Sequence, residues 1–336
     1  RVLRGLLDLP DYRVPGGAWA LAPDGAPAVA STTSPGFVVT LPPTGEPPYP
    51  TVLYQHGNGG EPLEVMSQGA LADAGFAFVA IDLPEFNDRA PADGLDVLSF
   101  LDFDSMARTR DNFRQTAADH LAVLAGFDAL NDAVATELGV DGALDRSRVF
   151  FMGNSLGAVS GGLTTAAARG LSGSALFVGG GGYPELLSQG IIAVLASPAL
   201  AGSDPRRETA LALVETIGDA GDPIALAAGA EEGLPVLFFQ AVDDALVATA
   251  ASDQMARAYG ARLARPFDHA VAGMDEVDLP ATGRVLVQAP MNEVPVNDRH
   301  GLLIVTDYAE EIVEHCFTAA AAGDPCEVID TGFADH

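Results

Sequence analysis

Short apolar runs alternate with longer, partly polar segments along most of this chain. The apolar runs have the length of buried strands, and the segments between them have the residue mix of helices. Strands that alternate with helices indicate a mostly parallel sheet with helices on both faces. The predicted strands are residues 36–41, 51–55, 76–82, 148–152, 174–178, 235–240 and 285–288, and the predicted helices are residues 62–74, 105–125, 158–169 and 302–321.

The first fifty residues have a different pattern. Residues 1–50 are rich in Pro and Gly and contain only short strand-like pieces. Proline within a sheet is confined to edge strands, first positions and bulges. We therefore expect antiparallel strands at the sheet edge.

The pentapeptide Gly153-Asn154-Ser155-Leu156-Gly157 joins a predicted strand to a predicted helix. It has the pattern G-x-S-x-G, in which a sharp strand-to-helix turn lifts a serine Oγ clear of the sheet. The turn is tight, so the residues two positions before and after the serine, Gly153 and Gly157, must be small. The pattern also occurs by chance in Gly-rich chains, but the strand and helix around it favour Ser155 as a nucleophile.

A second Gly-rich segment, His56-Gly57-Asn58-Gly59-Gly60, directly follows another predicted strand. Glycines let a backbone approach a substrate oxygen closely. The segment is therefore either a plain turn or part of a substrate site, in which Gly57 and Gly59 would lie against the substrate.

Two adjacent aspartates, Asp243 and Asp244, follow the predicted strand 235–240, and each is a candidate for a catalytic acid. Whichever of the two aspartates is not the catalytic acid would be a solvated loop or helix-cap carboxylate.

Two of the six histidines are candidates for a catalytic base. His300 lies in a polar loop between the last predicted strand and the last predicted helix, which favours it. His269 would fit only if the segment before it were the last core strand. The others have simpler interpretations: His56 belongs to the Gly-rich segment, and His120, His315 and His336 lie in a helix, in the last helix and at the end of the chain.

The charge balance excludes some partners. The net charge is −29, and all seventeen cationic residues are arginine. A chain this acidic lacks the basic surface that nucleic-acid binding needs, and an anionic membrane would repel it. No apolar run has the length of a transmembrane helix. The acidity suits saline surroundings, which screen self-repulsion, or it reflects genome composition; both interpretations stay open.

The two cysteines, Cys316 and Cys326, lie ten positions apart near the C-terminus, and a turn-forming Gly-Asp-Pro precedes the second. In an oxidising compartment a disulfide would tie the tail to the last helix; two buried free thiols are the alternative. Neither cysteine has the spacing of a zinc site, and no metal is expected.

These motifs together resemble the α/β-hydrolase superfamily, over about residues 38–322. The order Ser, Asp, His along the chain is the order of that superfamily. The run Asp244-Ala245-Leu246-Val247 is similar to its Asp-Pro-Val-Val pattern, which favours Asp244 over Asp243. The resemblance implies a triad of Ser155, His300 and Asp244, with the N–H groups of Asn58 and Leu156 as the oxyanion hole.

Three further stretches resemble bacterial extracellular lipases and esterases within that superfamily. They are residues 5–12, Ile81 to Pro84 followed by Arg89, and residues 110–115. Two positions depart from the pattern, because Asn154 stands where histidine is frequent and Phe86-Asn87 where His-Gly is often found. The departures affect the expected substrate and leave the reaction type intact.

The resemblance also implies a division of the chain. Residues 1–184 and 234–336 would form the hydrolase core, and residues 185–233 a cap inserted after the sixth strand. The apolar stretch 186–200 would cover the site, with Ile191 and Leu195 against an acyl chain; an ordinary core helix is the alternative.

The function implied is hydrolysis of a carboxylic ester, which is a small molecule, a lipid or a polymer, through an acyl-serine and without a cofactor. An amidase or acyltransferase would use the same triad, and a non-catalytic binding protein with this fold would normally have lost a triad member. We expect a secreted, periplasmic or cell-surface protein whose leader has been removed.

Overall fold

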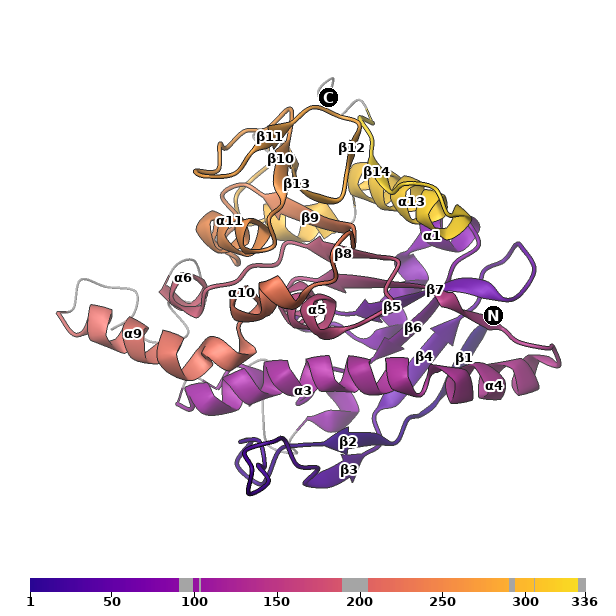
Figure 1. Ribbon diagram of the computed structural model, residues 1–336, viewed down its shortest axis with the longest axis horizontal. Coiled ribbons are helices and arrows are strands. Elements are labelled where there is room, and N and C mark those ends of the chain that lie inside the picture. Colours follow the sequence, from indigo (N-terminus) through magenta and orange to yellow (C-terminus); the bar gives the residue numbers. More distant parts are fainter. Residues whose placement is uncertain (91–98, 103, 189–204, 290–293, 305, 332–336) are drawn as a thin grey trace.

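The computed structural model describes residues 1–90, 99–102, 104–188, 205–289, 294–304 and 306–331. A 10-stranded sheet crosses the molecule (Figure 1), in the order β1-β4-β6-β5-β7-β8-β9-β13-β10-β11. Its strands are β1 (Val2–Leu6), β4 (Gly36–Thr40), β5 (Tyr49–Gln55), β6 (Ala77–Ile81), β7 (Leu144–Asn154), β8 (Gly173–Phe177), β9 (Val236–Ala241), β10 (Arg262–Ala264), β11 (Glu276–Val277) and β13 (Arg284–Ala289).

The sheet is parallel from β6 to β11 and antiparallel only where β4 pairs with β1 and β6. This confirms the predicted parallel sheet and the antiparallel edge strands in the first fifty residues. Two small antiparallel sheets complete the strands, β2 (Leu9–Asp11) with β3 (Ser31–Thr33) and β12 (Ala281–Thr282) with β14 (Glu327–Val328).

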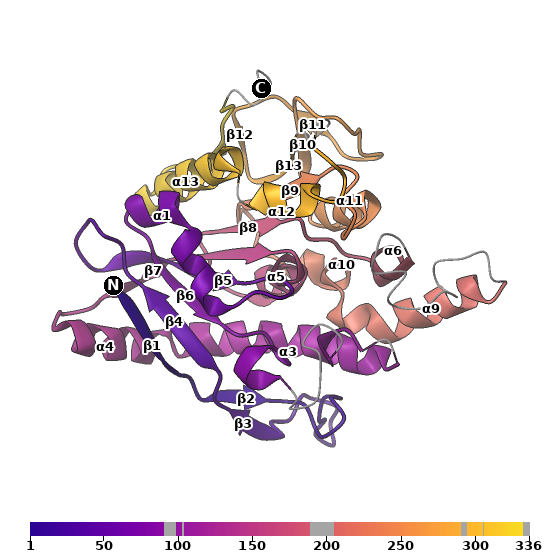
Figure 2. The same ribbon diagram turned by 180° about the vertical axis from the view of Figure 1, so that it is seen from behind.

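Helices cover both faces of the sheet (Figures 1 and 2). Side chains of α3, α4, α5 and α11 join one apolar core, and those of α1 and α13 join the core on the opposite face. No helix in the described ranges is long and apolar enough to cross a bilayer. The helices are η1 (Pro62–Ser67), α1 (Gly69–Asp73), η2 (Asn87–Arg89), α3 (Met106–Ala125), α4 (Phe127–Leu138), α5 (Leu156–Ala167), α6 (Tyr183–Ser188), α9 (Arg207–Gly218), η3 (Asp219–Gly221), α10 (Pro223–Leu226), η4 (Ala227–Gly229), α11 (Thr249–Ala258), α12 (Arg299–Ile304) and α13 (Asp307–Ala322).

Two predicted helices are each divided in the structure. The segment 62–74 forms the 3₁₀ helix η1 and then α1, because Gln68 between them leaves helical geometry, with ψ at 63°. The segment 302–321 begins earlier, in α12, and α13 starts after Thr306, which is extended with ψ at 134°. The apolar pattern continues across both breaks, so periodicity alone predicts one helix.

The strand order reverses direction beside β5, since β6 lies on one side of it and β7 on the other. In open parallel sheets, the loops that leave such a reversal point diverge and form the binding crevice at the carboxyl ends of the strands. The loop His56–Gly60 leaves β5 here, and Ser155 follows β7. The fold therefore brings the two Gly-rich motifs to the same edge.

The segment 205–233 contributes α9 and α10, and Figure 1 shows α9 extending beyond the sheet next to α3. α10 packs on α5. Most of the apolar stretch 186–200 lies outside the described residues. The cap over residues 185–233 therefore stays a prediction.

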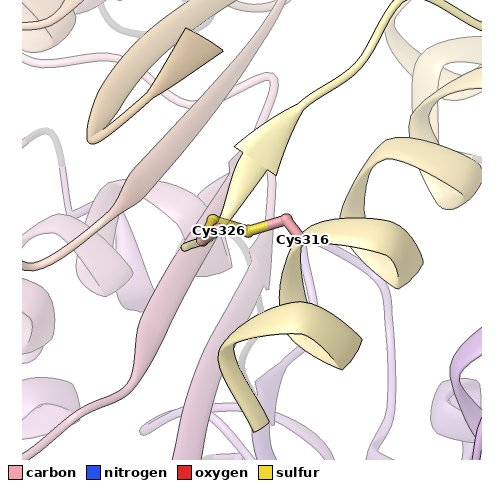
Figure 3. The surroundings of a disulfide bond; sticks show 2 residues. All are labelled: Cys316 and Cys326. Carbon is pink, nitrogen blue, oxygen red and sulfur yellow. A yellow bond between two sulfur atoms is a disulfide. The ribbon is translucent and has the colours of Figure 1, made fainter. Parts of the chain in front are cut away.

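The structure contains the disulfide between Cys316 in α13 and Cys326 beside β14 (Figure 3). Both residues are buried, and the bond ties the C-terminal strand to the last helix. Cys326 also lies in the apolar core on the α13 face.

Removing this disulfide by the paired substitution Cys316→Ala and Cys326→Ala is expected to lower the free energy of unfolding by about 2–3 kcal/mol, as for a loop of roughly ten residues. Denaturant unfolding of both proteins measures the difference. Activity should be unchanged, because the bond lies on α13, away from the carboxyl edge. An equal stability of the two proteins would contradict the prediction.

Candidate functional site

Ser155 sits at the turn between β7 and α5 in a conformation that side chains rarely adopt. Its φ is 53° and its ψ is −117°. Its amide donates to Phe177 O at 2.8 Å on the neighbouring strand, which anchors the turn. Such strain persists only where the surrounding structure enforces it, and it clusters at functional sites.

The glycines around Ser155 are required by close backbone contacts. A Cβ on Gly153 would come closer than 3.0 Å to the Gly157 carbonyl, and one on Gly157 closer than 3.0 Å to the carbonyls of Gln55 and His56. The G-x-S-x-G spacing therefore lets β7, α5 and the end of β5 pack together around the serine.

The structure brings Ser155, His300 and Asp244 together in one chain of hydrogen bonds. His300 Nε2 lies 2.8 Å from Ser155 Oγ, and His300 Nδ1 lies 2.6 Å from Asp244 Oδ2. Both His300 and Asp244 are buried. This geometry allows an imidazole to take the serine proton while the carboxylate holds its other nitrogen.

The Asp244 carboxylate is held by its own turn. Its Oδ1 accepts N–H bonds from Leu246 at 2.7 Å and Val247 at 3.3 Å, which leaves Oδ2 for His300. The neighbouring Asp243 points away, with a side chain that is 73% exposed and 3.4 Å from Arg299. Of the two aspartates, Asp244 alone contacts the histidine that faces Ser155.

The alternative base, His269, lies elsewhere. It follows β10, which is further from the sheet centre than β13, and its Nε2 lies 2.9 Å from Asp253 Oδ2. Its side chain is 41% exposed. The structure thus places a second His–Asp pair near the acid loop, and His300 is the histidine paired with Ser155.

The two oxyanion candidates flank the serine. Leu156 is the first residue of α5, and the first amides of a helix have no acceptor within it. On the other side, a Cβ on Gly57 would lie 3.0 Å from both Asn154 O and Ser155 Cβ, so the backbone before Asn58 lies against the serine. Gly59, with φ at 74°, is exposed.

His56 is fully buried and engaged through both ring nitrogens. Nδ1 donates to Gly57 O at 2.8 Å, and Nε2 accepts from the Leu83 N–H at 3.2 Å. Its partners therefore assign the proton to Nδ1. His56 orients backbone and does not face Ser155 Oγ in a hydrogen bond.

Asn154, one of the departures from the lipase pattern, extends beneath the turn. Its Nδ2 donates to Tyr54 Oη at 2.8 Å, and Tyr54 donates to Glu64 Oε2 at 3.0 Å. Burial raises the pKa of Tyr54 far above its ordinary value, so the phenol remains a donor. The chain of side chains links the serine turn to η1.

The three lipase-like stretches meet in the structure. Arg13, just after the first stretch, donates to Glu85 Oε1 at 2.7 Å and to Asn112 Oδ1 at 2.8 Å. The Tyr12 N–H donates to Gln115 Oε1 at 2.9 Å. The contacts join the N-terminal segment to the loop after β6 and to α3.

Arg299 is a site residue that sequence patterns did not single out. Its Nη1 donates to Val242 O at 2.7 Å and its Nε to Val294 O at 3.0 Å. His300 lies in the first turn of α12 and not in the loop that the sequence predicts, and Arg299 ties this turn to the loop that carries Asp244. No local pattern signals a contact between residues 57 positions apart.

Backbone strain is concentrated at the carboxyl edge of the sheet. In the described ranges, the non-glycine residues with positive φ are Glu85 and Asn87 after β6, Ser155 after β7, Val178 after β8 and Asp243 after β9. Each costs on the order of 1–3 kcal/mol. The strain makes the loops around Ser155 the candidate functional edge.

His120 lies in a buried polar layer behind the site. Its Nε2 lies 2.9 Å from Gln55 Oε1 and its Nδ1 lies 2.8 Å from Thr164 Oγ1. Burial, together with the nearby Arg89 and His56, lowers the pKa of His120 to about 3. The imidazole is neutral in the native protein at ordinary pH.

This pKa predicts an acid-sensitive stability. Because the folded pKa lies below the ordinary value of about 6.5, the unfolded chain binds one more proton between the two values, and stability falls as the pH falls. Between about pH 7 and pH 5, the free energy of unfolding should fall by about 2 kcal/mol more in the wild type than in His120→Gln. Urea unfolding of both proteins at both pH values measures this difference. An equal fall in the free energy of unfolding in the two proteins would contradict the lowered pKa of His120.

The two residues expected to line an acyl site, Ile191 and Leu195, lie outside the described residues. Next to Ser155, the described residues form a buried apolar cluster that includes Leu83, Phe86, Leu156 and Val247.

Comparison with known proteins gives a fold. No protein-family model and no curated protein matches the chain. A 2,6-dihydroxy-pseudo-oxynicotine hydrolase is similar in structure, with a TM-score of 0.52 at 14% identity, over 98% of this chain and 71% of the other. A prolyl endopeptidase gives 0.51 at 14% identity, over 98% of this chain and 38% of the other. An acylaminoacyl peptidase of Pyrococcus horikoshii gives 0.51 at 11% identity, over 93% of this chain and 42% of the other.

This chain thus spans less than half the length of either peptidase, and identities this low bear on fold alone. Together with the parallel sheet and its helices on both faces, these similarities show that the chain has the α/β-hydrolase fold.

Proposed function

We propose that this protein is a serine hydrolase that cleaves carboxylic esters through an acyl-serine intermediate. The observation that carries the proposal is the hydrogen-bond chain from Ser155 Oγ through His300 to Asp244, with distances of 2.8 Å and 2.6 Å. The chain starts at a strained serine on a strand-to-helix turn. Both distances are within the hydrogen-bond reach that activation of a nucleophile by an adjacent base requires.

In the first half of the proposed reaction, Ser155 Oγ attacks the ester carbonyl carbon while His300 Nε2 takes its proton. Asp244 holds the imidazole and stabilises its charged form. The protonated His300 then gives its proton to the leaving alcohol as the ester C–O bond breaks, which leaves the acyl group on Ser155.

The negative charge of the tetrahedral intermediate would be bound by the N–H groups of Leu156 and Asn58. A preorganised donor of this kind is worth roughly 3 kcal/mol of transition-state stabilisation. In the second half, water attacks the acyl-serine with His300 again as the base, and Ser155 regains its proton. None of these steps needs a metal or an organic cofactor.

Amide hydrolysis is the second candidate. Two of the similar structures are named as peptidases, and an amidase would use the same three residues. An acyltransferase would replace water with another acceptor. A binding protein that had lost its chemistry is disfavoured by the complete hydrogen-bond chain at Ser155.

A panel of p-nitrophenyl esters of increasing acyl length, with a matched p-nitroanilide, tests the proposal. We expect hydrolysis of the esters, with kcat/KM for the anilide far lower. An anilide cleaved as fast as its ester would favour the amidase, and no turnover of any substrate would contradict the proposed function.

We further propose that residues 185–233 cap the site and that Ile191 and Leu195 contact the acyl chain. Polar substitution there should then raise KM more for octanoate than for acetate esters, since each buried CH₂ is worth about 0.8 kcal/mol. Equal effects on both esters, with a large fall in melting temperature, would place this stretch in the structural core.

We also propose a location for the protein outside the reducing cytoplasm. The disulfide between Cys316 and Cys326 supports a secreted, periplasmic or cell-surface protein, because such bonds persist mainly in oxidising compartments.

A further inference from the structure

Two loops meet beside Ser155 and are joined by hydrogen bonds. The first is the oxyanion loop, Gly57 to Gly60, which follows β5. The second, here the β6 loop, is Asp82 to Arg89, which follows β6. The oxyanion loop has the serine turn on one side and hydrogen-bonds to the β6 loop.

Asn87 in the β6 loop holds the far end of the oxyanion loop. Its Nδ2 donates to Gly60 O at 3.1 Å and to Asp82 Oδ1 at 2.6 Å. Asp82 is buried, and its Oδ1 lies 3.5 Å from His56 Nε2. Both hydrogens of the Asn87 amide are therefore engaged, one with the oxyanion loop and one within the β6 loop.

His56 holds the near end. Its Nδ1 donates to Gly57 O, and its Nε2 accepts from Leu83 in the β6 loop. In a planar trans peptide, the carbonyl and the following N–H point in opposite directions. Fixing the Gly57 carbonyl towards His56 therefore turns the Asn58 N–H away from His56, so the direction of this proposed oxyanion donor is set by the same contacts.

The backbone of the β6 loop is itself strained where these contacts originate. Asn87 has φ at 47° and Glu85 has φ at 67°. Glu85 is fixed by Arg13 at 2.7 Å and Arg108 at 2.9 Å. Ion pairs thus hold the loop in a conformation that places the Asn87 amide against Gly60, and asparagine tolerates this region better than most residues.

We propose that Asn87 is a positioning residue of the oxyanion hole: its amide clamps Gly60 to Asp82 and, with His56, fixes the orientation of the Gly57–Asn58 peptide. The inference rests on the proposed function, in which the Asn58 N–H binds the oxyanion. It also gives a role to one of the positions where the chain departs from the lipase pattern.

Asn87→Gly tests the clamp, because it removes the side chain that carries the amide while glycine adopts the positive φ freely. We expect kcat/KM on p-nitrophenyl esters to fall by about 10- to 100-fold, the cost of a slightly misplaced oxyanion donor. A trifluoromethyl ketone, whose adduct carries an oxyanion, should bind more weakly by the same factor. The matching alcohol, which has no carbonyl, should bind equally well to both proteins.

Asn87→Asp keeps the shape of the side chain but cannot donate to Gly60 O when ionised, and it faces Asp82. It should lose at least as much activity, and it decides the question if the glycine variant does not fold. The matched control is Asn131→Gly, since Asn131 clamps the amides of Ala143 and Leu144 at 2.7 Å at the other end of β7. The control should lose stability and keep kcat/KM.

Unchanged kcat/KM and ketone affinity in a folded Asn87 variant would overturn this inference. The proposed function would survive that result if Ser155→Ala is inactive while the wild type hydrolyses esters. Equal weakening of the ketone and the alcohol would also overturn it, because a general loss of binding is not loss of an oriented oxyanion donor.

Discussion

Ser155→Ala is expected to lower kcat for ester hydrolysis by about 10⁵- to 10⁶-fold, the loss seen when a serine nucleophile is removed. The substitution deletes one oxygen, whose partner in the structure is His300 Nε2, and leaves the backbone bond from Ser155 to Phe177 in place. The melting temperature should therefore stay close to that of the wild type. Turnover by a folded Ser155→Ala protein at a rate near that of the wild type would rule out the assigned nucleophile.

The second large effect is expected at the base and the acid. His300→Ala and Asp244→Asn should each lower kcat by about 10⁴-fold or more, because the base is lost in one and its orientation in the other. The matched variants are His269→Ala and Asp243→Asn. We expect far smaller losses there, since His269 pairs with Asp253 and the Asp243 side chain is largely exposed.

Steady-state kinetics of these four variants, with circular dichroism to verify folding, gives the ranking within each pair. A larger loss for His269→Ala than for His300→Ala would mean that the hydrogen-bond chain at Ser155 is not the one used in catalysis. A larger loss for Asp243→Asn than for Asp244→Asn would mean the same.

The parts of this molecule that sequence patterns predict are those encoded by neighbouring residues. The turn at Ser155 is predictable because a strand, two glycines and a helix are contiguous, and each glycine is required by a contact within that turn or with the adjacent strand. His300 and the pair Asp243-Asp244 are predictable from their places after β13 and β9, since the carboxyl ends of parallel strands meet at one edge. The choice of Asp244 within the pair comes from the resemblance of Asp244-Ala245-Leu246-Val247 to the superfamily pattern.

The parts that escape prediction depend on contacts between distant segments. The clamp from Asn87 to Gly60 joins residues 27 positions apart, and the bond from Arg299 to Val242 joins residues 57 apart. Neither side chain belongs to a periodic pattern. The division of the last helix at Thr306 is missed for a related reason, because the apolar spacing continues through a residue whose backbone is extended.

The structure also gives a role to the arginines of this acidic chain. Several of the seventeen arginines are partly or fully buried and bonded to loops around the site, among them Arg13, Arg89 and Arg299. Arginine presents several donors in a rigid fork, which suits contacts to carboxylates and carbonyls at once. Part of the cationic content of this acidic chain therefore holds the loops around Ser155 in place.

The central claim is that Ser155 is activated by His300 and Asp244, and labelling with a fluorophosphonate tests it most directly. Intact-mass and peptide mass spectrometry should show one phosphonyl group per molecule, on Ser155. Labelling should be absent in Ser155→Ala and strongly slowed in His300→Ala. Stoichiometric labelling of the Ser155→Ala protein, or a wild-type protein that stays unlabelled while folded, would contradict the account.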